Sequence, residues 1–539
     1  MTRRSLLISG LVLLLTIAGA AVRLDRIHAI GLSHFDAGVY AQSGLWPWTG
    51  QFHFNQAFFS PPLFPILIGT INAIAGTPID WAGPLVSALA GILLVPAGYW
   101  IAKDWFHERA GLMAATLLAF DPAQVLFSRV GLTDELFTLL FLVGFALTRS
   151  AVQRGGWRRL IVAGIVVGLA WNTKYHGFLA AGLGLACVPG SRDPVVRIGR
   201  LAWISGIALS FYLPWAISFH VEHGYLSLIE HQRGYFRGLP GWWEGARSGW
   251  STWAIFGGTL VWLVPAAESA WALLRRSSVR PNLLLLLAGI SAALMIFLPE
   301  SSNLASLLLI LPLALMGCCR PVMRQQDFSL LASFVVLLFL PGIYAPYARL
   351  WLPTETLLLI LASGAWDRAD SLTDQQIEKR RFPSIMAPVY LMLVISGIVF
   401  VTRMMGFVQQ NDLYRSHAGY REVARESTAD LADKRQILTL CRWPMNYYLA
   451  LEGKNVQPLG DQAGISDLLR GNLLLYDQTA SDTQSFHAVW DRLIEEGRDR
   501  FWEIDLDLLT RLDDVDQPTT RLESLFETGP KTRLFRHEP

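Results

Sequence analysis

Long apolar runs alternate with short polar connections over residues 1–403 and predict a polytopic α-helical membrane protein. A helix needs about 20 apolar residues to cross the hydrocarbon core of a bilayer, where backbone polar groups must be satisfied within the protein. The runs lie at residues 5–22, 62–76, 83–101, 110–127, 134–148, 159–174, 176–189, 199–217, 251–274, 281–298, 304–318, 327–345, 350–366 and 384–402. The first run also has the basic flank and small residues of a signal peptide. Because so many runs follow it, we expect an uncleaved span.

Basic clusters between the runs set the orientation, because Lys and Arg accumulate in cytoplasmic loops. The clusters are Arg3/Arg4, Lys103/Arg109, Arg149/Arg154/Arg158/Arg159, Arg192/Arg197/Arg200, Arg275/Arg276/Arg280, Arg320/Arg324 and Lys379/Arg380/Arg381. All of them face the cytoplasm only if the run at 62–76, which is short and contains Pro65, lies at the outer interface without crossing. This arrangement leaves about thirteen spans, with the N-terminus in the cytoplasm and the C-terminus outside.

Three connections then face the outside, at residues 23–82, 128–133 and 218–250. The first and third are long for a protein with otherwise tight connections, and such loops usually carry function. The third contains His220, His223 and His231, which form either a solvated cluster or a metal site.

The composition changes after Arg403. Residues 404–539 are polar and charged, with short alternations of apolar and polar residues at 436–440, 455–459 and 472–476 and a helical pattern at 486–496. We therefore expect residues 1–403 to form a transmembrane module and residues 404–539 a small extracytoplasmic α/β domain.

Composition narrows the class of protein further. Of the residues, 52% are hydrophobic and only 16% charged, and the 20 Trp and 14 Tyr suit a protein with two membrane interfaces. The net charge of +2 gives no indication of nucleic-acid binding. The four cysteines lack metal-ligand spacing, so they predict neither a metal site nor a disulfide framework.

Two aspartates fall on the outer side at the same depth. Asp36 follows the first span, and Asp134 opens the span that follows the loop at 128–133. Either residue is also suited to begin a helix, and Asp134 after Thr133 to cap one. Their shared side and depth favour a joint role in a site.

Three cations lie on the same face, against the general bias of membrane proteins. They are Arg129, Lys174 and Arg349. Snorkelling to the interface is the alternative role for such residues. Together they predict a site for a phosphate close to the membrane.

The order of these features resembles the GT-C glycosyltransferases of the protein-O-mannosyltransferase and lipid A aminoarabinose-transferase type. One span is followed by a long outer loop with an acidic residue and by Pro61-Pro62-Leu63. Then come Ser128-Arg129 with Asp134, Thr173-Lys174-Tyr175, and finally Tyr347, Arg349 and Pro353. The resemblance covers roughly residues 5–400 and is best over 20–180. It implies about thirteen spans and an outer C-terminal domain.

The resemblance also implies roles for residues. Asp36 would be the general base on the acceptor, Asp134 would orient the acceptor or the sugar, and the lipid phosphate would bind Arg129, Lys174 and Arg349, with Tyr347. Tyr40 and Glu135 are further candidates for this site.

The sequence departs from the family pattern in two places. Ala37 stands where many relatives have Glu, and Phe59-Ser60 stand where aminoarabinose-transferase-like relatives have Glu-Lys. His53 and Asn55 lie close enough in sequence to substitute. Whether a divalent metal takes part therefore stays open, and no cofactor is predicted with certainty.

The resemblance implies an inverting transfer of sugar from a polyprenyl-phosphate carrier to a protein, lipid or polysaccharide acceptor at the outer face of a bacterial inner membrane. Two other classes stay open. A transporter or flippase predicts ionisable residues at mid-bilayer and an internal repeat, whereas mid-span charges are scarce and no repeat is evident. A non-catalytic scaffold agrees with the departures at Ala37 and Ser60.

Overall fold

The computed structural model describes most of the helical part of the chain and selected segments of the rest. The described residues are 3–29, 31–32, 35–49, 60–189, 191, 193–244, 328–344, 348–377, 421, 424–425, 437–440, 447–449, 451, 456–458, 473–477, 501–504 and 532–537.

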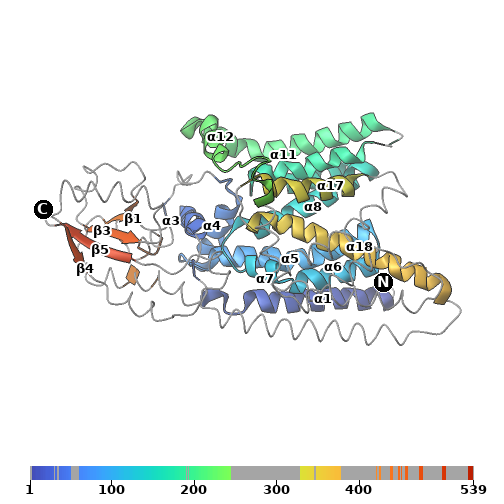
Figure 1. The fold of residues 1–539 in the computed structure, drawn as a ribbon, viewed down its shortest axis with the longest axis horizontal. Helices are drawn as coiled ribbons and strands as arrows, with labels where there is room; N and C mark the ends of the chain where they lie inside the picture. Colours follow the sequence, from blue (N-terminus) through green and yellow to red (C-terminus); the bar gives the residue numbers. More distant parts are fainter. Residues whose placement is uncertain are drawn as a thin grey trace.

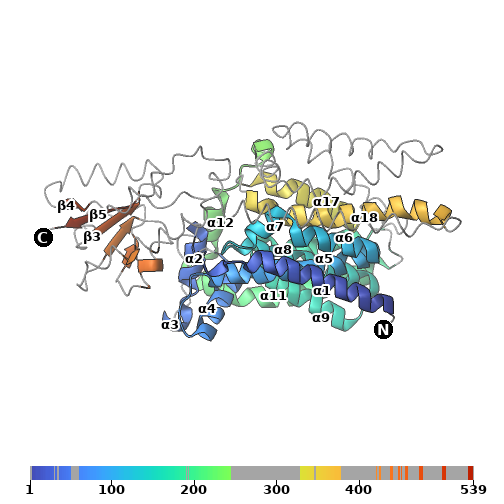
Figure 2. The ribbon, with the colours of Figure 1, turned by 90° about the horizontal axis from the view of Figure 1, so that it is seen from below.

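Long helices run side by side along the longest axis of the molecule (Figures 1 and 2). The helices of this bundle are α1 (Arg3–Leu24), α5 (Ala82–Trp105), α6 (Glu108–Phe120), α8 (Thr133–Arg154), α9 (Trp157–Trp171), α11 (Pro194–His223), α17 (Ser329–Phe339) and α18 (Leu352–Ile377). The shorter helices α2 (Phe35–Ser43), α3 (Trp46–Thr49), α4 (Leu63–Ala75) and α12 (Tyr225–Arg233) gather at one end of the bundle, and the N-terminus of α1 lies at the other. Two further short helices, α7 (Pro122–Phe127) and α10 (Leu179–Gly182), complete the described helical part, with brief 3-10 turns between elements.

Among the described residues, four helices are long and apolar enough to cross a membrane: Ser5–Leu24, Ala82–Trp105, Thr133–Arg154 and Pro194–His223. On α1 the side chains of Leu7 and Leu14 are 65% and 62% exposed, as expected for a helix that faces lipid. The chain is thus an integral membrane protein.

The interior of the bundle is built from aromatic and small residues. Phe141 and Phe145 of α8 are fully buried. Gly98 of α5 faces Leu118 of α6 so closely that an added Cβ would lie 2.2 Å from the leucine Cδ1. Close backbone approach at small residues is typical of helices packed in membranes, and it makes a rigid frame for the residues at the helix ends.

Several predicted runs differ from single continuous spans, and those at 62–76 and 110–127 bear most on the site. The run at 110–127 forms α6 and α7, separated at Asp121, because Pro122 disfavours a helical conformation at the residue before it. The Asp121 carboxylate accepts a hydrogen bond from the backbone N–H of Gln124 and so caps α7 (3.1 Å). The run at 62–76 forms α4, whose 13 residues span roughly 20 Å, too short to cross the bilayer.

The runs at 251–274, 281–298, 304–318 and 384–402 lie outside the described residues. The predicted number of spans therefore stays a prediction.

Five strands form one mixed sheet near the C-terminus. They are β1 (Ile437–Leu440), β2 (Val456–Pro458), β3 (Leu473–Asp477), β4 (Phe501–Ile504) and β5 (Thr532–His537), in the order β2-β1-β3-β5-β4. β1 is parallel to β2 and β3, whereas β5 is antiparallel to β3 and β4, with Leu474 opposite Phe535. β1, β2 and β3 fall on the three predicted alternations. The predicted helix at 486–496 lies outside the described residues, so the α/β domain stays a prediction.

Candidate active site

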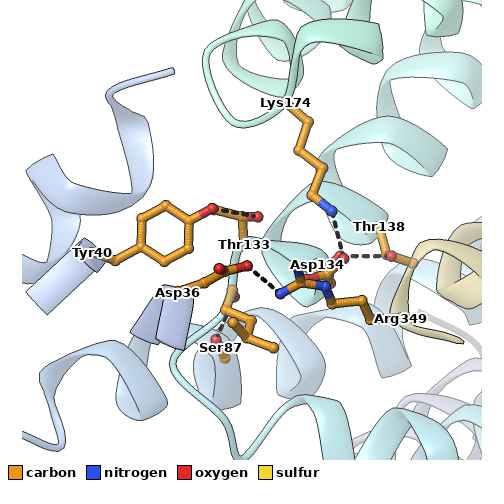
Figure 3. Close-up of polar contacts among 9 residues, drawn as sticks. Asp36, Tyr40, Ser87, Thr133, Asp134, Thr138, Lys174 and Arg349 are labelled. Carbon is orange, nitrogen blue, oxygen red and sulfur yellow. Dashed lines mark hydrogen bonds and ion pairs between the residues drawn. The ribbon is translucent and has the colours of Figure 1, made fainter. Parts of the chain in front are cut away.

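Asp36 and Arg349 form an ion pair at the end of the bundle that carries the short helices (Figure 3). Asp36 lies in the first turn of α2, and Arg349 lies in a 3-10 turn, Ala348–Trp351, just before α18. The arginine Nη1 lies 2.5 Å from the aspartate Oδ2, and both side chains are largely buried. Two residues far apart in sequence thus meet as a charged pair that is shielded from water.

Asp134 and Lys174 form a second ion pair beside the first. The lysine Nζ lies 2.5 Å from Oδ1 of Asp134, which sits in the first turn of α8. α9 ends at Trp171, so Lys174 reaches the aspartate from the turn that follows it. Leu132 is the N-cap residue of α8 and makes no side-chain capping bond. The Asp134 carboxylate therefore serves the ion pair, although its position near the helix N-terminus also favours a negative charge.

The two ion pairs belong to one electrostatic cluster. Arg349 interacts with both Asp36 and Asp134, and Lys174 interacts with both aspartates and with Arg349. Burial lowers the pKa of Lys174, and the charge of Asp134 opposes this effect. Burial also pulls the pKa of Arg349 down, but Asp36 and Asp134 outweigh it and raise that pKa. The cluster holds two carboxylates and two cations in surroundings that strengthen every interaction.

Tyr40 adds a phenol to this cluster. It lies one helical turn after Asp36, and its hydroxyl is 3.4 Å from Oγ1 of Thr133, the residue before Asp134 (Figure 3). Burial and the nearby charge of Asp36 raise the pKa of Tyr40, so the phenol keeps its proton at neutral pH. Ser87 of α5 donates a hydrogen bond to the carbonyl of Leu132 (2.9 Å) and fixes the turn that leads into α8.

Arg129 lies apart from these contacts. Its guanidinium donates hydrogen bonds to the carbonyls of Val22 (2.7 Å), Arg23 (3.1 Å) and Asp25 (2.6 Å) at the end of α1. A cation that binds the last carbonyls of a helix stabilises its C-terminus. The structure therefore brings Asp36, Tyr40, Asp134, Lys174 and Arg349 together, while Arg129 holds the start of the outer loop.

Glu135 belongs to a second set of buried polar side chains. It is fully buried, and neither of its carboxylate oxygens has a hydrogen-bond partner among the described residues. Arg23, Asp121 and Glu355 are buried close to it. The sequence analysis missed these three residues, although Glu355 stands out as an acidic residue within an apolar run.

The connection that follows α11 packs against the segment that leads to Arg349. The backbone N–H groups of Arg237 and Gly238 donate to the carbonyl of Ile343 (3.0 and 3.1 Å). The Tyr344 hydroxyl donates to the side-chain oxygen of Gln232 (2.7 Å). This connection therefore supports the segment that leads to Arg349.

Several predicted residues lie outside the described part of the chain, namely His53, Asn55 and Tyr347. Among the residues that are described, no group of three His, Cys, Asp or Glu side chains is arranged to hold a metal ion. His220 instead accepts a hydrogen bond from the backbone N–H of Tyr225 (3.2 Å).

Sequence comparison gives a partial match. Residues 60–217 match the family described as dolichyl-phosphate-mannose-protein mannosyltransferase. Two Bacillus subtilis (strain 168) proteins are similar, YkcB and YycA, to which a mannosyltransferase activity is assigned by name. They are 32% identical over 153 residues and 31% identical over 147 residues, covering 27% and 26% of this chain. The matches span only 21% and 22% of the length of these relatives.

Comparison of structures identifies the fold. ArnT from Cupriavidus metallidurans in the apo state matches with a TM-score of 0.50 and 17% identity, over 89% of this chain and 95% of ArnT. The oligosaccharyltransferase AglB from Archaeoglobus fulgidus, in complex with an inhibitory peptide and a dolichol-phosphate, matches with a TM-score of 0.50 and 13% identity. That match covers 88% of this chain and 70% of AglB. The chain therefore shares its fold with ArnT and AglB, in agreement with the fold that the sequence resemblance implied.

Proposed function

We propose that this protein transfers a sugar from a polyprenyl-phosphate carrier to an acceptor at the extracytoplasmic face of the membrane. The observation that carries the proposal is the joint cluster of Asp36 with Arg349 and Asp134 with Lys174. The family match over residues 60–217 and the GT-C fold support it. The dolichol-phosphate in the AglB structure supports a polyprenyl-phosphate carrier as the donor.

The cluster has the groups that this reaction needs. The acceptor oxygen or nitrogen attacks the anomeric carbon while Asp36 takes its proton, and the bond from that carbon to the phosphate oxygen breaks. The polyprenyl phosphate leaves as an anion, so it needs positive charge rather than a proton, and Lys174 and Arg349 supply that charge. A direct displacement of this kind inverts the anomeric carbon.

Asp134 and Tyr40 would prepare the site in this mechanism. Asp134 holds the Lys174 ammonium in place and is close enough to orient the sugar or the acceptor. Tyr40, whose phenol keeps its proton, offers a hydrogen-bond donor beside Asp36. Arg129 would contribute by holding the end of α1, because its terminal nitrogens bind backbone carbonyls.

The family resemblance raises a divalent metal, and the described residues do not offer a ligand set for one. Ala37 also replaces the second acidic residue of the first loop. We therefore derive no step through a metal, and the roles above rest on side chains alone.

The proposed orientation places the active site outside the cytoplasm. The basic clusters favour a cytoplasmic N-terminus. The cluster and the sheet both lie toward the end of the molecule opposite to that N-terminus (Figures 1 and 2). We propose a bacterial inner-membrane protein with about thirteen spans and an extracytoplasmic α/β domain at residues 404–539.

The proposal is tested by release of free polyprenyl phosphate from a panel of polyprenyl-phosphate sugars, with protein in lipid and a cell-envelope extract as acceptor. Asp104→Asn is a matched control, since Asp104 pairs with Arg154 in a separate exposed ion pair (2.7 Å). A flippase would move the donor across the bilayer without releasing polyprenyl phosphate. A scaffold would do neither.

A further inference from the structure

A tyrosine hydroxyl and an ion pair tie the loop at residues 23–82 to the C-terminal segment. The hydroxyl of Tyr448 accepts a hydrogen bond from the backbone N–H of Leu32 (3.0 Å) and donates one to Oδ2 of Asp80 (2.7 Å). The same Asp80 oxygen forms an ion pair with Arg421. Residues that are distant in sequence thus share one hydrogen-bonded junction.

This junction is buried except at Arg421, whose side chain is 49% exposed. Leu32 is fully buried, and Tyr448 and Asp80 are 4% and 8% exposed. The ring of Tyr448 packs edge-on against the fully buried Tyr447, with 5.6 Å between ring centroids. Removing one partner of a buried, hydrogen-bonded charge is costly. The contact is therefore part of the folded core and not a loose surface approach.

The junction is linked along the chain to both aspartates of the candidate site. Leu32 lies four residues before Asp36, in the connection between α1 and α2, which also contains Arg26 and Gly31 with positive φ. Asp80 lies just before α5, which carries Ser87. Ser87 in turn bonds the carbonyl of Leu132, two residues before Asp134.

We propose that Arg421 and Tyr448 form a clamp that positions Asp36 for catalysis. The C-terminal segment is then a working part of the active site, in addition to any role it has in choosing the acceptor. This inference rests on the proposed function of Asp36. Arg421 and Tyr448 touch no reacting atom and act as positioning residues through Leu32 and Asp80.

Neighbouring tyrosines provide a matched pair of variants. Tyr448→Phe removes the hydroxyl that joins Leu32 to Asp80 and keeps the packed ring. Tyr447→Phe is the control, because the Tyr447 hydroxyl has no hydrogen-bond partner among the described residues. Arg421→Gln tests the ion pair separately, because it leaves the bond from Tyr448 to Asp80 in place, and Arg421→Lys is its charge-retaining control.

The first readout is hydrogen–deuterium exchange of peptides that contain Leu32, measured on the full chain in lipid. It does not depend on enzyme activity. We expect Tyr448→Phe to speed exchange at the Leu32 amide by roughly 3- to 10-fold, and Tyr447→Phe to leave it unchanged. Equal exchange in the two variants overturns the clamp.

The second readout is turnover. We expect Tyr448→Phe to lower kcat about 10-fold or more, with little change in the KM for donor, since small displacements of a catalytic group cost rate. Arg421→Gln should also lower kcat, and Arg421→Lys should retain part of the rate that Arg421→Gln loses. Faster exchange with unchanged kcat would mean that the clamp does not position Asp36. If the wild type consumes no donor, the proposed function fails, and the exchange result still decides the clamp.

Discussion

The Asp36 carboxylate meets the Arg349 guanidinium at 2.5 Å, although the two residues come from α2 and from the turn before α18. The pair leaves a candidate base in contact with a candidate phosphate ligand. A donor phosphate that approaches Arg349 would therefore compete with Asp36 for the same cation. Such competition would free the carboxylate to accept a proton only when the donor is bound.

The pairing of Asp134 with Lys174 predicts a specific pH dependence. Burial lowers the pKa of Lys174, and Asp134 opposes this effect. Lys174 must be protonated to hold a phosphate, so donor binding should weaken as the pH rises through its pKa. In Asp134→Asn the opposing charge is lost, and the alkaline limb of kcat/KM should move to lower pH.

Asp134→Asn should lower turnover about 100-fold near neutral pH, a loss typical of a group that supports proton transfer or orientation. A double variant with Lys174→Gln should lose much less than the product of the two single losses, because each partner acts through the other. Fully multiplicative losses, together with an unmoved alkaline limb, would contradict a functional pair.

Arg129 should act through stability. Arg129→Ala removes the bonds to the carbonyls of Val22, Arg23 and Asp25. We expect this to lower the free energy of unfolding by about 1–3 kcal/mol, which is measured as a lower Tm in detergent. Arg129→Lys should restore part of the lost stability. An unchanged Tm combined with a raised KM for donor would instead assign Arg129 to the lipid phosphate.

The topology is tested by reporter fusions. A reporter placed after Pro539 should be active outside the cytoplasm, because the basic clusters and the non-crossing α4 leave the C-terminus there. A second reporter in the connection between α8 and α9 should be cytoplasmic. A cytoplasmic reporter at Pro539 would mean that the number of spans is wrong by one.

The sequence grouped the main residues of the candidate site but did not predict their contacts. Span counting gives side and depth, which sufficed to group Asp36, Asp134, Lys174 and Arg349. It does not give rotation about the helix axis, so the pairing of each aspartate with its cation became visible only in the structure. Arg129 lies at a similar depth, yet its guanidinium binds backbone carbonyls.

Other features could not be predicted for different physical reasons. The break at Asp121 follows from Pro122, and local rules would have found it. The junction of Leu32, Asp80 and Tyr448 depends on a contact between distant segments made by ordinary residue types, so no local pattern marks it. The helices of the bundle follow from long apolar runs, because the bilayer fixes the length and direction of a helix that crosses it.

The central claim is that Asp36 acts as the base in transfer from a polyprenyl-phosphate sugar. The direct measurement is the rate at which polyprenyl phosphate is released from one polyprenyl-phosphate sugar. It is made in lipid for wild type, for Asp36→Asn and for the control Asp104→Asn. The account predicts release by wild type and by Asp104→Asn, and a rate lower by about 100-fold or more in Asp36→Asn. Equal release by wild type and Asp36→Asn, with both folded, would contradict it.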